Sequence, residues 1–197
     1  MLKAIEDRRS IRKFSGQDIP DEVIRKIIES GIKAPSAKNR QPWKFIVVKG
    51  DSKASMLEAF KQGLHREEHS DALLPESSCH LGDAKRSIEI MEQAPVIVFI
   101  VNVQGKGLFE KTTPEERIYE TANIESIGAA IQNMLLEATE RGIGSLWICN
   151  VFFAYQELQQ WINTQGDMAA AVAFGYALEQ PKARPRKRFD DTVAWRK

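Results

Sequence analysis

An unbroken apolar run at residues 95–101 constrains the fold of this chain more than any other feature. Its valine, isoleucine and phenylalanine side chains would point to both faces of a strand, and both faces must then be covered. We therefore predict a buried, central strand. A second apolar run at 168–174 predicts another buried strand, because both runs are far shorter than the roughly 20 residues that a membrane span needs.

Helices and strands alternate along the rest of the chain. The segment 20–30 places Ile24, Ile27 and Ile28 on one stripe at helical spacing, which predicts an amphipathic helix. A longer helix is expected over 115–141, with an apolar face that begins at Ile124, and we expect it at the centre of the molecule. The remaining predicted helices are 53–63, 84–93 and 154–161. The remaining predicted strands are 43–48 and 145–149, and the second apolar run belongs to a final strand over 169–176.

Three segments do not follow the pattern of a helix or strand. Residues 65–82 are polar and predict irregular structure, and 104–114 carry glycines, a proline and mixed charge, as in a loop or lid. From Ala177 onward the chain is strongly basic yet keeps Phe189 and Trp195, which indicates a tail that docks on another surface. With 197 residues and 43% hydrophobic content, the chain is expected to form one domain over 1–197.

Positive charge gathers at the two ends of the chain. Arg8, Arg9 and Arg12 lie near the start, and Arg184 and Arg186 lie near the finish. Guanidinium groups bind phosphate oxygens in pairs, so the two ends could close on one anionic group, and solvated surface is the alternative. The whole chain has 28 Lys and Arg against 27 Asp and Glu, a balance that argues against nucleic-acid binding.

Several other kinds of site are disfavoured. The charged N-terminus lacks the apolar core of a signal peptide, and Cys79 and Cys149 lie far apart, which favours a cytoplasmic protein without a disulfide. His65 and His69 could share a helix face, but no second pair of ligands accompanies them, so no metal site is expected. The segment 142–144 lacks the third glycine of a dinucleotide fingerprint, so a nicotinamide nucleotide would bind only transiently.

The order of four motifs is the most specific signal in the sequence. The motifs are Arg8-Arg9-Ser10-Ile11-Arg12-Lys13-Phe14, Ala34-Pro35-Ser36-Ala37-Lys38-Asn39-Arg40-Gln41-Pro42-Trp43, the helix 125–138 followed by 142–148, and the ending 174–193. Together they resemble the nitroreductase family of flavin enzymes over nearly the whole chain. The resemblance implies an α+β fold, in which a central, mostly antiparallel sheet is flanked by helices, and an intertwined homodimer.

The resemblance also implies a site for tightly bound, non-covalent FMN. The residues that would form it are Arg8, Arg9, Ser10, Arg12, Pro35, Ser36, Asn39, Gln132, Leu146, Trp147, Ile148, Arg184 and Arg186. Since the flavin would carry the chemistry, no catalytic side chain is predicted. Cys149 follows Ile148 and could tune the flavin or fill space, and we favour the second interpretation.

By the same resemblance, the chain is expected to use NAD(P)H as co-substrate and to reduce nitroaromatics, quinones or similar electron-poor small molecules in a ping-pong reaction. Each flavin would lie at the interface of a homodimer, and an arm of about 177–197 would extend onto the partner subunit. The alternatives within this fold are a reductive dehalogenase, a flavin-modifying enzyme and a non-catalytic flavin-binding sensor. Neither a nucleic acid nor a membrane is expected as a partner.

Overall fold

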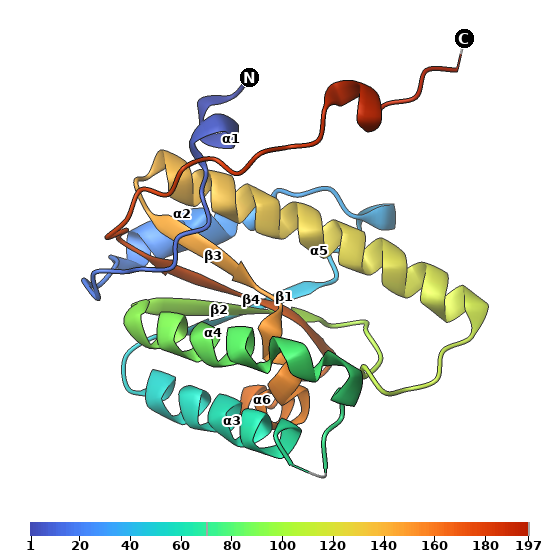
Figure 1. Cartoon of the computed structure of the whole chain (residues 1–197). Coiled ribbons are helices and arrows are strands. Elements are labelled where there is room, and N and C mark those ends of the chain that lie inside the picture. The colour runs from blue at the N-terminus through green and yellow to red at the C-terminus, as the bar shows by residue number, and fades with distance from the viewer. Residues whose placement is uncertain (70, 197) are drawn as a thin grey trace.

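A computed structural model describes residues 1–69 and 71–196 as an antiparallel sheet between two layers of helices (Figure 1). The strands are β1 (Trp43–Val48), β2 (Val96–Asn102), β3 (Gly144–Ile148) and β4 (Asp167–Gly175), and their order in the sheet is β1-β2-β4-β3. Each pair of neighbouring strands is antiparallel. The predicted α+β class and antiparallel sheet are confirmed.

Different helices cover the two faces of the sheet. One layer contains α2 (Asp21–Ile32) and α5 (Pro114–Glu140), and the other contains α3 (Ser52–Glu67), α4 (Leu81–Gln93) and α6 (Tyr155–Ile162) (Figure 1). A short helix, α1 (Lys3–Asp7), contacts α5. Short 3-10 helices lie at Ala37–Asn39, Pro75–His80, Asn150–Ala154 and Phe189–Asp191.

The central strand β2 supplies side chains to both layers. Val98 and Ile100 pack into the core beneath α2 and α5, whereas Ile97 and Phe99 pack into the core formed with α3, α4 and α6. All of these side chains are fully buried, and each contributes about 1.5–3 kcal/mol by leaving water. The prediction of a central strand covered on both faces is confirmed.

The position of α5 differs from the prediction. The helix does not lie at the centre of this chain but covers one face of the sheet, and residues of its first half are exposed on the opposite side (Figure 1). Ile124, which the periodicity assigned to the buried face, is 44% exposed, and Ile118 nearby is 67% exposed. A helical apolar stripe does not distinguish burial within one chain from burial against another.

The segment 65–82 is also more regular than its polar sequence predicts. Helix α3 continues to Glu67, a 3-10 helix spans Pro75–His80, and α4 begins at Leu81. The buried carboxylate of Glu67 accepts hydrogen bonds from the backbone N–H groups of Leu73 and Leu74, at 2.9 and 3.0 Å. Such local polar contacts leave no periodic pattern in the sequence. Residue 70 of this segment, like residue 197 of the predicted arm, lies outside the described residues.

Residues 10–15 lie between the edge of β3 and the chain that leaves β4. The N–H of Ile11 donates to the carbonyl of Ser145 in β3, at 3.0 Å. On the other side, the N–H of Ser15 donates to the carbonyl of Tyr176, and the N–H of Leu178 donates to the carbonyl of Lys13, both at 2.9 Å. These backbone pairs bring the beginning and the end of the chain side by side.

Two glycines make room for this N-terminal segment. Gly144 and Gly175 face each other across β3 and β4. A Cβ atom on Gly175 would lie 2.7 Å from Cδ1 of Phe14, and a Cβ atom on Gly144 would lie 3.0 Å from Cγ1 of Ile11. Because Ile11 and Phe14 are both buried, neither can move away without opening the core.

We therefore expect Gly175→Ala to destabilise the protein by about 1–3 kcal/mol, the usual cost of overfilling a packed site. Urea unfolding of the variant and the parent protein measures this difference. Gly82→Ala is the matched control, since nothing lies within 4 Å of a Cβ at Gly82 in α4 and alanine favours helices. Equal midpoints for the two variants would contradict the close contact between Gly175 and Phe14.

Candidate functional site

Basic residues from both ends of the chain line one pocket of about 360 Å³, which we call the terminal pocket. Its polar lining consists of Glu6, Arg8, Arg9, Ser10, Arg12, Lys182, Arg184 and Arg186. The structure thus brings together the arginines that the sequence analysis linked through their charge. They lie on opposite ends of the sequence and meet because residues 10–15 pair with the chain after β4.

The guanidinium groups of the terminal pocket have no carboxylate partner among the described residues. Instead, Nη1 of Arg9 donates to the carbonyls of Glu6 and Arg8, at 2.5 and 2.9 Å, and Nη1 of Arg12 donates to the carbonyl of Ser10, at 3.2 Å. Each guanidinium carries more donors than these bonds use. The five arginines and Lys182 outnumber the one carboxylate of the lining, Glu6, and this excess of positive charge favours an anionic ligand.

A second pocket of about 390 Å³, which we call the β3-edge pocket, adjoins the terminal pocket and shares Arg12 and Arg184 with it. It runs along β3, the edge strand, and is lined there by Leu146, Trp147 and Ile148. The backbone carbonyl of Ser145 points away from β4 and accepts from the N–H of Ile11. Along a strand, the backbone N–H and carbonyl groups of successive residues point alternately to one edge and to the other. Trp147 therefore directs its backbone N–H and carbonyl towards the open side, where a planar polar ring could bind.

Several side chains of the β3-edge pocket were not predicted from the sequence, and they come from α4 and from the 3-10 helix after β3. Arg86 and Ser87 lie on α4, and Asn150 donates from Nδ2 to Oγ of Ser87, at 3.1 Å. Arg86 pairs with Asp83 at 3.2 Å. No motif marks these residues, and Arg86 and Ser87 reach β3 only because α4 packs beneath the sheet.

Cys149, for which we favoured a space-filling role, is not part of the buried core of this chain. Its side chain is exposed and lines the β3-edge pocket. Partial desolvation raises the pKa of the thiol, so it stays protonated at neutral pH. Cys79 is likewise free and exposed.

The other predicted site residues lie elsewhere in the chain. Pro35, Ser36 and Asn39 belong to a loop that packs on α5, and Gln132 is a half-buried residue of α5 itself. None of them lines the terminal or the β3-edge pocket. Within one chain, the predicted site is therefore divided into two parts.

The loop of residues 36–41 has a strained backbone. Lys38, Asn39 and Gln41 adopt left-handed φ values of 54°, 53° and 48°, each of which costs about 1–2 kcal/mol for a residue with a side chain. Oγ of Ser36 accepts from the N–H of Gln41, at 3.0 Å, and stabilises the turn. Strain of this kind is common where a loop serves a ligand.

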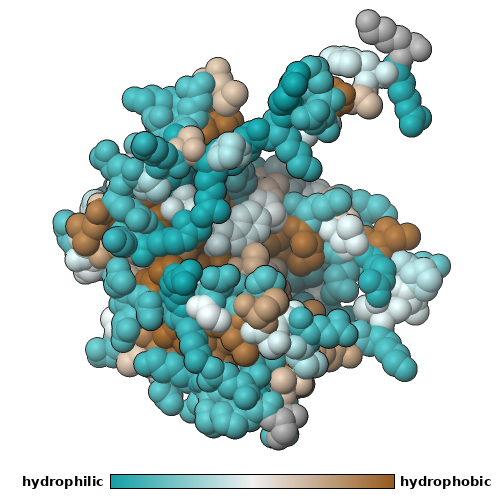
Figure 2. All heavy atoms as spheres, viewed as in Figure 1, coloured by the Kyte–Doolittle hydropathy of each residue, from teal (hydrophilic) through white to brown (hydrophobic). Residues whose placement is uncertain are grey.

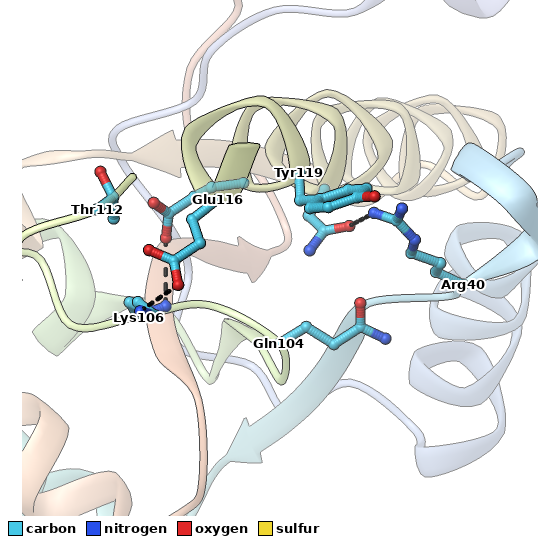
Figure 3. Close-up of a pocket in the computed structure, with 8 residues that line it drawn as sticks. Arg40, Gln104, Lys106, Thr112, Glu116 and Tyr119 are labelled. Atoms are coloured by element: carbon cyan, nitrogen blue, oxygen red, sulfur yellow. Dashed lines mark hydrogen bonds and ion pairs between the residues drawn. The ribbon is translucent and has the colours of Figure 1, made fainter. Parts of the chain in front are cut away.

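A third pocket, of about 330 Å³, lies beside this loop (Figure 3). Its lining residues are Arg40, Gln104, Lys106, Thr112, Glu116, Tyr119, Glu120 and Asn123. One wall comes from the predicted 104–114 loop, which ends where Thr113 and Glu116 form a capping box at the start of α5. We call this space the loop pocket.

A buried hydrogen-bond network holds the 104–114 loop, which forms this wall, against the body of the protein. The hydroxyl of Tyr155 donates to the carboxylate of Asp167 and accepts from the N–H of Leu108, at 3.0 Å. Burial raises the pKa of Asp167 to about 6, against the lowering effect of the bond from Tyr155, and the nearby charges of Glu120 and Glu110 raise it further. Asp167 therefore titrates within the range of ordinary assay conditions.

Neither a metal cluster nor a membrane-spanning helix is found in the described residues, 1–69 and 71–196. They contain no cluster of three or more side chains able to hold a metal ion. In the same residues, no helix is both long and apolar enough to cross a membrane.

The fold and the pockets define an α+β protein with an open strand edge that leads into an arginine-lined pocket. The chain matches the nitroreductase family over residues 5–176 and belongs to that family. A protein of Archaeoglobus fulgidus, predicted to be an NADH dehydrogenase/NAD(P)H nitroreductase, is 33% identical over 148 residues, which cover 75% of this chain and 66% of that protein.

Two further relatives mark the range of the similarity. A 5,6-dimethylbenzimidazole synthase of Rhodospirillum rubrum is 28% identical over 152 residues, 72% of this chain and 64% of that protein. The chain thus spans about two thirds of the length of both curated relatives. A crystal structure of a predicted nitroreductase from Desulfovibrio desulfuricans, in complex with FMN, superposes with a TM-score of 0.73 at 24% identity and covers 100% of this chain and 96% of that one.

The raised pKa of Asp167 predicts a pH-dependent stability difference. The folded state binds the proton more tightly than the unfolded chain, whose aspartate pKa is about 3.9, so this group's contribution to stability falls as pH rises from about 4 to about 6. Asp167→Asn should remove that change, which is about 3 kcal/mol for a pKa difference of about two units. Urea unfolding of both proteins at several pH values measures it.

Asp83→Asn, at an exposed position, is the control for the loss of one carboxylate. A stability difference between Asp167→Asn and the parent protein that stays constant between pH 4 and pH 7 would contradict the assignment.

Proposed function

We propose that this protein is an FMN-dependent NAD(P)H oxidoreductase that reduces electron-poor small molecules such as nitroaromatics and quinones. The terminal pocket carries the proposal, because its guanidinium groups form no ion pair with a carboxylate among the described residues and a flavin phosphate would give them an anionic partner. Membership of the nitroreductase family and the name of the Archaeoglobus relative support the same activity.

The proposed binding mode divides FMN between two pockets. Arg8, Arg9, Ser10 and Arg12, with Arg184 and Arg186, would hold the phosphate in the terminal pocket. The ring would lie along residues 146–148, where the exposed backbone of Trp147 can bond its polar edge. When bound, FMN would supply the two-electron redox chemistry between NAD(P)H and an acceptor. The side chains of this site then bind and orient, and none needs to act as an acid or base.

We further propose a homodimer, in which the two parts of the site meet. Pro35, Ser36, Asn39 and Gln132 would then complete the flavin site of the opposite subunit. The open side of α5, with Ile118 and Ile124, offers apolar surface for such an interface. As Figure 2 shows, the C-terminal arm stands away from the body and hydrophobic surface lies open below it.

The arm itself has the composition of a segment that binds another subunit. Phe189 is 63% exposed and Trp195 is 74% exposed in an otherwise basic sequence. Exposed aromatic anchors of this kind are enriched at protein interfaces. In this proposal, residues 1–176 form the body of one domain, the arm of 177–197 extends onto the partner, and the dimer acts in the cytoplasm.

The redox activity is tested with purified protein loaded with FMN. We expect NADH or NADPH to bleach the flavin absorbance in a stopped-flow experiment, and menadione or nitrofurazone to restore it after the nucleotide is consumed. Steady-state rates should give the parallel double-reciprocal lines of a ping-pong reaction. A protein that binds FMN but is not reduced by either nucleotide would instead be a flavin-binding sensor, and the proposal would fail.

A second candidate is an activity like that of the Rhodospirillum relative, a 5,6-dimethylbenzimidazole synthase, within the flavin-modifying alternative. Chromatography of the flavin after aerobic incubation with NADPH separates the two. A reductase returns its FMN unchanged after many turnovers, whereas a flavin-modifying enzyme consumes it.

For the dimer, we expect a double substitution, Phe189→Ala with Trp195→Ala, to shift the protein towards monomer and to lower its flavin content. Light scattering coupled to size-exclusion chromatography measures the first effect, and absorbance measures the second. Removal of the residues after Ala177 should abolish both dimerisation and FMN binding. A truncated protein that stays dimeric and yellow would contradict the proposed arm, and Leu108→Ala controls for the loss of an exposed apolar side chain outside the arm.

A further inference from the structure

We infer that the loop pocket selects aromatic acceptors that carry a carboxylate, and that Arg40 recognises this carboxylate. The inference rests on the proposed function, since it names a substrate class for the site beside the strained loop of residues 36–41. Arg40 belongs to that loop, and the opposite wall of the pocket is the start of α5 (Figure 3).

Arg40 is held in place from two sides. Its guanidinium carbon lies 4.4 Å from the centroid of the Tyr119 ring, and Nη1 donates to Oδ1 of the buried Asn123, at 3.4 Å. A guanidinium has five N–H donors, and a single hydrogen bond leaves most of them for a ligand. The side chain is therefore positioned before a ligand arrives, which reduces the entropy that binding would cost.

The two cations of the pocket differ in their partners. Nζ of Lys106 pairs with Glu116 at 2.7 Å, and the N–H of Lys106 donates to Glu120 at 3.3 Å. Arg40, by contrast, forms no ion pair with a carboxylate among the described residues. Figure 3 shows the group around Lys106 and Glu116 at one end of the pocket and Arg40 with Tyr119 at the other.

This charge distribution gives a ligand one orientation. A carboxylate would be repelled by Glu116 and Glu120 and attracted to Arg40, where it can accept two parallel N–H bonds. The Tyr119 ring is half exposed and offers an aromatic ligand a surface for stacking. At about 330 Å³, the pocket lies at the small end of the range for small-molecule sites, which suits a compound with one substituted ring.

A purely structural role for Arg40 makes a different prediction. The bonds to Asn123 and Tyr119 also fasten the loop to α5, so the loss of Arg40 could disturb the loop for every substrate alike. If Arg40 recognises a carboxylate, its loss lowers kcat/KM only for the charged acceptor. The ratio of two kcat/KM values, one for a charged and one for a neutral acceptor of similar shape, separates the two roles.

The experiment uses the FMN-loaded protein with 4-nitrobenzoate and 4-nitrobenzamide as acceptors. We expect the ratio of kcat/KM for 4-nitrobenzoate to that for 4-nitrobenzamide to fall about tenfold or more in Arg40→Gln, as for the loss of one charge-assisted hydrogen bond. Arg40→Lys keeps the charge but not the paired donors, so its ratio should lie between those of the parent protein and Arg40→Gln. Lys111→Gln removes an exposed charge from the neighbouring loop outside the pocket, and its ratio should equal that of the parent protein.

An unchanged ratio in Arg40→Gln would overturn the inference, even if both rates fell. Failure of the proposed function is recognised separately, because the parent protein would then reduce neither acceptor nor menadione. In that case, the binding of benzoate, which is not reducible here, is measured by NMR line broadening. Weaker binding in Arg40→Gln would support the carboxylate site, and equal binding in both proteins would overturn it.

Discussion

The backbone pairing of residues 10–15 with β3 on one side and with the chain after β4 on the other is the constraint on which the candidate site depends. These hydrogen bonds place arginines from both ends of the sequence around one pocket, where their charges repel one another. The buried side chains of Ile11 and Phe14 stabilise this arrangement, and the facing glycines Gly144 and Gly175 permit it. Packing energy in the core thus maintains an electrostatically unfavourable cluster, and an anionic ligand would relieve it.

The second constraint is that one chain contains the parts of the site but does not bring them together. The strained loop with Ser36 and Asn39 packs on α5, away from the arginines and the open edge of β3. The same chain leaves one side of α5 and the aromatic side chains of its arm exposed. A homodimer would account for both observations, because it would cover the apolar surface and join each loop to the opposite flavin site.

Much of the fold could be predicted because its elements bury most of their apolar residues within one chain. The run 95–101 required a strand covered on both faces, and β2 is such a strand. The sequence was less informative where burial depends on another chain or on isolated polar contacts. Ile124 follows the helical periodicity but is exposed, and Glu67 organises the segment after α3 without a periodic signal. The terminal arginines could be grouped by charge and motif, whereas Arg86 reaches β3 only through tertiary packing.

The central claim, that arginines from both ends close on a flavin phosphate, is tested most directly by comparing the affinities of FMN and riboflavin, which differ only in that phosphate. Fluorescence titration of the flavin-free protein should show that FMN binds about tenfold to a hundredfold more tightly, as for one or more charge-assisted hydrogen bonds, and that Arg12→Ala narrows the difference. Equal affinities for FMN and riboflavin in the parent protein would contradict the account.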